Sequence, residues 1–197
     1  MPNQKNNIFI ISGPSGVGED SVIERLKKIL PIERVVTATT RPMRPGEKQG
    51  SPYYFITKAE FEKKIKLNGF FEYAQEYNDN YYGVTHEEIN RVRRQKDKIG
   101  IWKIEYKGVI SAKKIMPEIV AIFLNASLAD LEKRIRRRSS VTDEYIKERM
   151  AYTEEWLEHR DVYDYEIENR EGELEKTVKK VAQIIKERTN IAYNAKF

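Results

Sequence analysis

Between an apolar run and a helical segment, the chain reads Gly13-Pro14-Ser15-Gly16-Val17-Gly18-Glu19-Asp20-Ser21. The run before it, Ile8–Ser12, is short and nearly all apolar, which is typical of a strand. After it, Val22, Leu26 and Ile29 recur at helical spacing. A strand, a glycine loop and a helix are therefore predicted in that order.

The rest of the chain continues this alternation. Apolar runs at 99–104 and 119–124 predict strands buried on both faces of a parallel sheet, and 165–167 predicts a last short strand. A crossover between the two long runs and three further helices are expected at residues 109–115, 128–138, 143–158 and 174–188. The alternation predicts an α/β fold with about five parallel strands in its core.

Residues 38–97 have a different sequence pattern from the rest of the chain. Short aromatic, β-prone stretches alternate there with polar helices, at residues 53–56, 58–68, 70–74, 81–84 and 85–96. A chain of 197 residues is too short for two large independent domains. We therefore expect a small lobe inserted into a single domain.

Composition narrows the class of protein. Hydrophobic residues make up 40% and aromatic residues 11%, enough for a folded chain. No apolar run approaches the roughly 20 residues of a membrane helix, so we expect neither a membrane span nor a signal peptide. With no cysteine, the chain cannot form disulfides or thiolate metal sites, and two histidines 73 positions apart argue against a histidine metal site. A net charge of +5 favours anionic ligands such as phosphates.

The glycine loop follows part of the phosphate-binding pattern GxxxxGK[S/T]. In that pattern backbone N–H groups surround phosphate oxygens, the lysine bridges the terminal phosphates and the hydroxyl reaches Mg²⁺. Here the glycines are kept, but Glu19 takes the lysine position and Asp20 the hydroxyl position. An ordinary glycine turn is the alternative for the loop taken alone.

Four further motifs follow in order. Residues 39–47 read TTRPMRPGE, 53–55 read YYF, 71–74 read FEYA and 81–83 read YYG. Together with the loop they resemble the guanylate kinase family over nearly the whole chain. The resemblance implies a three-layer phosphate-loop kinase fold that phosphorylates GMP to GDP with ATP. It also implies a core at 1–37 and 98–197, a GMP-binding lobe at 38–97 and a mobile lid near 134–149.

The same resemblance implies the residues that bind the two nucleotides. For ATP they are Gly13, Pro14, Ser15, Gly16, Val17, Gly18, Glu19, Asp20, Ser21 and Asn169. For GMP they are Thr37, Arg41, Arg44, Tyr53, Glu72, Tyr82 and Glu105. Arginines and phenols suit a phosphate dianion, and a carboxylate at Glu72 offers two acceptors to the guanine N1–H and 2-amino groups. Taken singly, these side chains could be surface charges or core aromatics, and Asn169 could belong to a strand-end turn.

The implied catalytic residues are cations. Arg134 and Arg138 have the four-residue spacing of the arginines that clamp the transferring phosphate, and Arg149 lies on the helix after the lid. A solvated basic helix face or a nucleic-acid patch is the alternative for this cluster.

Lys103 is the second departure from the family pattern. Residues 103–108 read KIEYKG where the family has two acids around an apolar residue, then glutamine and glycine. The fold would place this strand end beside the glycine loop, so we expect Lys103 next to Glu19 and Asp20. Our hypothesis is that Lys103 replaces the missing loop lysine, while Asp20, Glu105 or Glu19 positions Mg²⁺ through water. The alternative is a salt bridge that seals an inactive loop.

The expected partners are ATP and GMP, with Mg²⁺ as cofactor and no nucleic acid or membrane. We expect a cytoplasmic monomer or homodimer. Two other functions stay open: an inactive guanylate kinase-like binding module, and a kinase for another phosphorylated acceptor.

Overall fold

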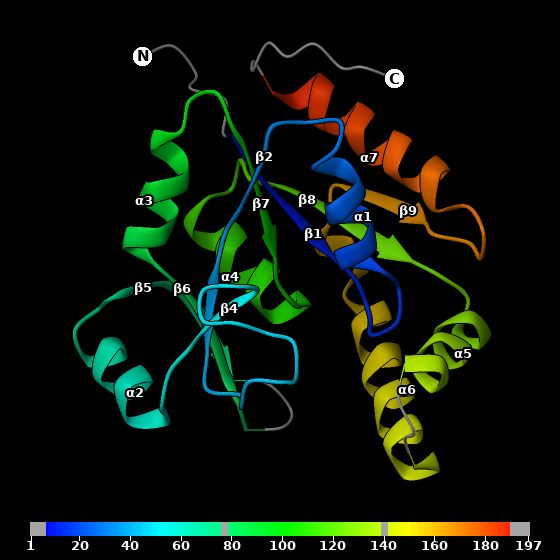
Figure 1. Ribbon diagram of the computed structural model, residues 1–197, viewed down its shortest axis with the longest axis horizontal. Helices are drawn as coiled ribbons and strands as arrows, with labels where there is room; N and C mark the ends of the chain where they lie inside the picture. The colour runs from blue at the N-terminus through cyan, green and yellow to red at the C-terminus, as the bar shows by residue number, and fades with distance from the viewer. Residues whose placement is uncertain (1–6, 76–78, 139–141, 190–197) are drawn as a thin grey trace.

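The computed structural model describes residues 7–75, 79–138 and 142–189 and shows two sheets (Figure 1). The larger sheet has five strands, all paired in parallel, in the order β2-β7-β1-β8-β9. Its strands are β1 (Ile8–Ser12), β2 (Ile32–Arg34), β7 (Ile99–Lys103), β8 (Val120–Asn125) and β9 (Tyr165–Glu168). The predicted parallel core sheet is therefore confirmed.

Helices cover both faces of this sheet, which makes three layers. Phe9 and Ile11 of β1 pack with α1 (Glu19–Leu26) and α7 (Leu174–Arg188), which lie beside each other in Figure 1. Ile8 and Ile10 point to the other face, against α3 (His86–Arg94) and α4 (Tyr106–Ile115). Because successive side chains of a strand alternate, the central strand β1 contributes to both halves of the core.

The second sheet is mixed and has the order β4-β3-β6-β5. Its strands are β3 (Thr37–Thr39), β4 (Tyr53–Phe55), β5 (Phe70–Gln75) and β6 (Tyr81–Thr85). Helix α2 (Lys58–Lys66) begins in a capping box between Thr57 and Glu60, and Phe61 stacks on Phe70 with ring centroids 4.2 Å apart. Every strand and helix expected between residues 38 and 97 is present.

Helices α5 (Leu128–Arg138) and α6 (Asp143–Glu158) follow β8, and a 3₁₀ turn at Arg160–Val162 leads to β9. The predicted lid spans the end of α5 and the start of α6. Its residues 139–141 and the side chain of Arg138 lie outside the described part of the chain. Tyr152 and Trp156 of α6 pack with Tyr106 of α4 and Phe123 of β8, so α6 is fixed to the core sheet.

Two helices begin earlier than the sequence predicts, and one strand was missed. Helix α1 begins at Glu19, inside the segment predicted as the glycine loop, and the acids of its first turn suit the positive end of a helix dipole. Helix α4 begins at Tyr106 instead of Val109. The short strand β2 was not predicted.

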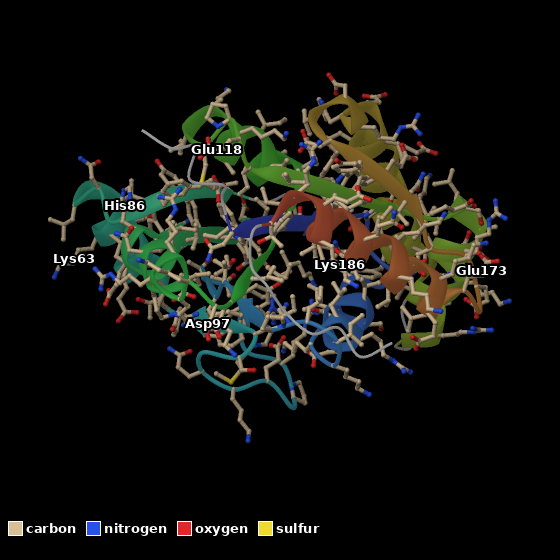
Figure 2. The ribbon with its side chains drawn as sticks, turned by 90° about the horizontal axis from the view of Figure 1, so that it is seen from above. Lys63, His86, Asp97, Glu118, Glu173 and Lys186 are labelled. Atoms are coloured by element: carbon tan, nitrogen blue, oxygen red, sulfur yellow. The ribbon has the colours of Figure 1, made fainter. Side chains whose placement is uncertain are left out.

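Many charged side chains are exposed, among them Lys63, Asp97 and Glu118, which are labelled in Figure 2. Within the described residues, none of the helices is both long and apolar enough to cross a membrane.

Candidate active site

The glycine loop between β1 and α1 has the backbone of a tight phosphate-binding turn. Gly16 and Gly18 adopt φ angles of 89° and 97°, a region that side chains rarely tolerate. A Cβ on Gly13 would lie 2.5 Å from the carbonyl oxygen of Leu124. The three glycines are thus required by the local geometry, and the loop leads directly into the N-terminus of α1.

Lys103 reaches the loop as predicted. Its ammonium lies 2.7 Å from Oδ2 of Asp20 and lines a cavity beside the loop. Burial would lower the pKa of Lys103, but the carboxylates of Glu19 and Asp20 raise it above its ordinary value. Lys103 is therefore a charged ammonium at the position expected from the sequence.

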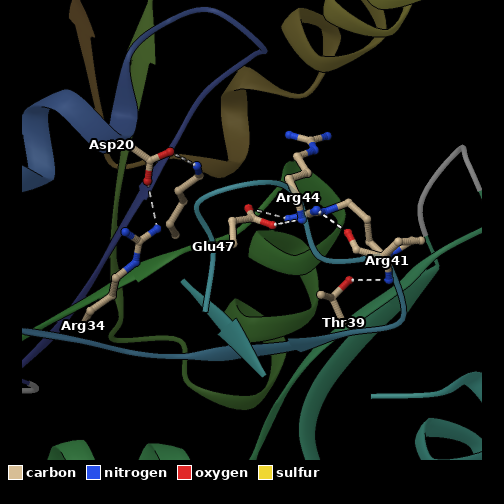
Figure 3. Close-up of polar contacts among 8 residues, drawn as sticks. Asp20, Arg34, Thr39, Arg41, Arg44 and Glu47 are labelled. Carbon is tan, nitrogen blue, oxygen red and sulfur yellow. Dashed lines mark hydrogen bonds and ion pairs between the residues drawn. The ribbon is translucent and has the colours of Figure 1, made fainter. Parts of the chain in front are cut away.

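Arg34 was missed by the sequence reasoning. At the end of β2, its Nη2 lies 2.9 Å from Oδ1 of Asp20, so Asp20 has one cation on each oxygen (Figure 3). Burial would raise the pKa of Asp20, but Lys103 and then Arg34 lower it to about 2. The sequence could have indicated Arg34 only if the three-residue strand β2 had been recognised. Strand β2 pairs with β7, so its last residue lies near Lys103 at the end of β7.

Arg134 and Asn169 lie on the other side of the loop. Arg134 donates from Nη2 to the carbonyl of Asn169 at 2.9 Å and forms an ion pair with Glu171. Asn169 is buried and donates from Nδ2 to the carbonyl of Val17 at 2.7 Å. A cavity of about 390 Å³ lies here, lined by Gly16, Gly18, Glu19, Asp20, Ser21, Arg134 and Asn169, among others.

On the side of the second sheet, Glu47 organises the loop that carries two predicted arginines. Arg41, only 8% exposed, donates from Nη2 to Glu47 Oε1 at 2.8 Å, and the Arg44 amide donates to Oε2 at 2.7 Å (Figure 3). Burial would raise the pKa of Glu47, but these hydrogen bonds, above all that from Arg41, lower it. Arg41 is thereby held against the rings of Tyr53 and Phe55, each 5.4 Å from its guanidinium carbon.

Tyr53 and Tyr82 pack edge to face, with ring centroids 5.8 Å apart. Burial raises the pKa of the Tyr82 phenol, so this group is a neutral hydrogen-bond donor near pH 7. The two phenols and Arg41 come from β4, β6 and the loop after β3, which adjoin in the second sheet.

Glu72 and Thr37 are both buried, 5% and 4% exposed. A Cβ on Gly108 would lie 3.3 Å from Oε1 of Glu72, so α4 approaches the Glu72 carboxylate closely at a position without a side chain. Val84, the partner of Glu72 on the neighbouring strand β6, is fully buried in the core against α3 and α4.

One cavity of about 230 Å³ joins the glycine loop to the second sheet. Its lining includes Gly13, Ser15, Gly16, Glu19, Asp20, Thr37, Arg41, Arg44, Tyr53, Glu72, Tyr82, Lys103, Glu105 and Arg149. Of the other predicted residues, Gly18, Ser21, Arg134 and Asn169 line the cavity on the opposite side of the loop. Pro14 and Val17 line neither of these two cavities, and the side chain of Arg138 lies outside the described part of the chain. Gly16, Glu19 and Asp20 border both cavities, so the loop separates them.

Helix α6 closes this cavity on the side opposite the second sheet. Arg149 lines it, and its Nε donates to the hydroxyl of Tyr145 at 3.1 Å. Tyr152, which the sequence reasoning did not single out, donates to Oε2 of Glu105 at 2.6 Å. Glu105 is therefore positioned by α6 as well as by its own strand end.

Asp20 and Glu105, which were expected to position Mg²⁺ through water, are both engaged by other side chains. Both carboxylate oxygens of Asp20 are bound by cations, and Glu105 accepts the hydrogen bond from Tyr152. Over residues 7–75, 79–138 and 142–189, no group of three or more His, Asp or Glu side chains is arranged to hold a metal ion.

Comparison with known proteins finds relatives of this chain in both sequence and fold. The sequence model of the guanylate kinase family matches residues 5–188. A protein named guanylate kinase from Rickettsia felis is 41% identical over 183 residues, covering 92% of this chain and 93% of that protein. One from Mycoplasmoides gallisepticum is 37% identical and covers 94% of each chain. A crystal structure of guanylate kinase from Anaplasma phagocytophilum has the same fold, with a TM-score of 0.72 and 24% identity over 93% of this chain and 87% of that one. This chain belongs to the guanylate kinase family.

Proposed function

We propose that the protein transfers the terminal phosphoryl group of ATP to GMP, giving ADP and GDP. The observation that carries the proposal is the single cavity in which Arg41, Tyr53, Glu72 and Tyr82 face the glycine loop and Lys103. An acceptor nucleotide in the lobe and a donor at the loop would meet there. Direct in-line transfer needs this juxtaposition and little other chemistry from the protein.

On the acceptor side, we propose that the lobe at residues 38–97 binds GMP. Arg41, Arg44, Tyr53 and Tyr82 would hold its phosphate, because forked guanidinium donors and neutral phenols match a dianion. Glu72 would accept from the guanine N1–H and 2-amino groups, and adenine lacks that pair of donors. The buried position of Glu72 supports this role, since a desolvated carboxylate discriminates strongly between matched and unmatched partners.

On the donor side, Lys103 would take the place of the loop lysine. Its ammonium is already beside the loop, paired with Asp20, and lines the cavity. A small movement toward the donor would exchange the Asp20 carboxylate for phosphate oxygens. Arg149, in the same cavity, would offset charge on the phosphoryl group as it moves, and Arg134 would act from the opposite side of the loop.

Magnesium would arrive bound to the ATP phosphates. We assign the magnesium ion no direct protein ligand, because the carboxylates of Asp20 and Glu105 are already hydrogen-bonded. These carboxylates would contact the ion through water.

The test is ADP formation from ATP, with and without GMP, by the wild-type protein and by Lys103→Ala. We expect GMP-dependent ADP formation in the wild type and a loss of about 100-fold or more in the variant, the usual effect of removing one charge-stabilising group. The exposed Lys114→Ala is the matched control, since it removes the same charge away from the cavity. Unchanged turnover in Lys103→Ala would reject the assigned role.

The Lys103–Asp20 ion pair also favours one competing function, a GMP-binding module whose donor site is closed by that pair. Calorimetric titration separates the two. A module would bind GMP, fail to bind ATP and form no ADP, whereas the kinase would bind both nucleotides.

A further inference from the structure

The two cations on Asp20 have different surroundings. Lys103 and Arg34 come from the carboxyl ends of neighbouring strands, β7 and β2, and each binds a different oxygen of the carboxylate. Of these two described side chains, Lys103 lines the cavity beside the loop and Arg34 does not. Lys103 is thus the cation that a donor phosphate can meet, whereas Arg34 binds the other oxygen of Asp20 without lining the cavity.

The strand that carries Arg34 is supported by further ion pairs. The side chain of Arg34 is 17% exposed, and its carbonyl accepts a hydrogen bond from Arg91, which in turn pairs with Glu33 and Glu88. Strand β2 therefore has its own ion-pair network behind it. Among the described residues, the side chains of Lys103 and Arg34 each make one hydrogen bond, to Asp20. They differ in their chemistry, because Lys103 has a flexible four-carbon stem whereas the guanidinium of Arg34 is a planar, rigid fork.

The negative charge of Asp20 would repel the triphosphate of the donor. The carboxylate borders both cavities and lies at the position that a phosphate-loop hydroxyl normally occupies. When Lys103 turns to the donor, Asp20 loses one of its two partners while a highly charged triphosphate comes near. A like-charge contact at short range weakens anion binding unless another cation neutralises the carboxylate.

We propose that Arg34 is a positioning residue that stays bound to Asp20 as its permanent counter-ion and so frees Lys103 to bind the donor phosphates. This inference rests on the proposed function. It explains why Asp20 holds two cations on separate oxygens, when one would suffice for a closed salt bridge.

The test is a double-mutant cycle with Arg34→Ala, Asp20→Asn and the combined variant. The dissociation constant of ATP is measured by calorimetry without GMP, alongside that of GMP and the steady-state constants. We expect Arg34→Ala to weaken ATP binding about tenfold, with KM for ATP rising and the affinity for GMP unchanged. In the combined variant ATP affinity should return to within about twofold of Asp20→Asn alone, because a neutral amide needs no counter-ion.

Arg25→Ala is the matched control. Arg25 lies in the last turn of α1 and forms an exposed ion pair with Glu175 of α7. Its replacement by alanine removes the same charge as Arg34→Ala without touching Asp20. Arg34→Lys keeps a cation and should retain most of the ATP affinity, and it serves as the test if Arg34→Ala does not fold.

ATP affinity in Arg34→Ala equal to that of the wild type, or an additive loss in the combined variant, would overturn the inference. A purely structural role would weaken GMP binding as well and would not be rescued by Asp20→Asn. Wild-type protein that binds ATP but forms no ADP with GMP would refute the proposed function, while the ATP affinities of the four proteins would still decide on Arg34.

Discussion

Asn169, directly after the last strand, donates a hydrogen bond to the carbonyl of Val17 in the glycine loop at 2.7 Å, although 152 positions separate the two residues. The Oδ1 of Asn169 accepts from the hydroxyl of Thr177 on α7 at 3.0 Å. One buried amide therefore ties the phosphate loop to the end of the core sheet and to its final helix.

Asn169→Ala should destabilise the fold. The substitution leaves the buried Thr177 hydroxyl without the Asn169 oxygen and the Val17 carbonyl without the Asn169 amide, which costs about 1–3 kcal/mol. Urea denaturation should show a lower free energy of unfolding. Thr177→Ser, which keeps the hydroxyl, is the control, and equal stability of Asn169→Ala and wild type would contradict the argument.

Glu72→Gln should weaken GMP binding about 10- to 100-fold, because the amide replaces one of the two acceptors by a donor and removes the charge. Calorimetric titration with GMP measures this directly. Tyr73→Phe on the same strand is the control, since its exposed side chain points to the opposite face. GMP affinity equal to wild type in Glu72→Gln would exclude Glu72 from base recognition.

The sequence predicts much of this site, and physical reasons explain why it did not predict the contacts of Arg34 and Tyr152. Lys103 and Asp20 were expected to meet because parallel strands end at one edge of a sheet, and their 2.7 Å contact confirms it. Strand β2 has only three half-buried residues, Ile32–Arg34, and gives no periodic signal, so Arg34 went unnoticed. Tyr152 lies on a helix that was predicted correctly, but nothing in local spacing indicates that its hydroxyl reaches Glu105 47 positions away.

Glu47→Gln should raise the KM for GMP about three- to tenfold with a smaller change in kcat. The neutral amide binds Arg41 less tightly, and the guanidinium then loses the orientation in which it faces the cavity. Steady-state kinetics at saturating ATP measure the effect. Glu62→Gln, on the exposed face of α2, makes the same chemical change outside the site and should leave KM unaltered.

The Asp20 carboxylate should make stability depend on pH in acid. Its pKa is lowered in the fold from 3.8 to about 2, so its ion pairs stabilise the protein fully above pH 3.8. That contribution declines as the pH falls from 3.8 and is gone below about 2. Denaturation of wild type and Asp20→Asn across this range should show a stability difference that is constant above pH 4 and shrinks below it. A constant difference down to pH 2 would mean that Asp20 titrates normally.

The sharing of Asp20 between Lys103 and Arg34 restricts which charges positions 19 and 103 can carry together. Restoring lysine at position 19 alone would crowd a third cation against those two, and restoring an acid at position 103 alone would leave three neighbouring carboxylates facing Arg34. Each single change leaves unbalanced charge at the nucleotide. The charges at positions 19 and 103 are therefore coupled, and the common pattern is electrostatically balanced only when both positions, on α1 and on β7, change together.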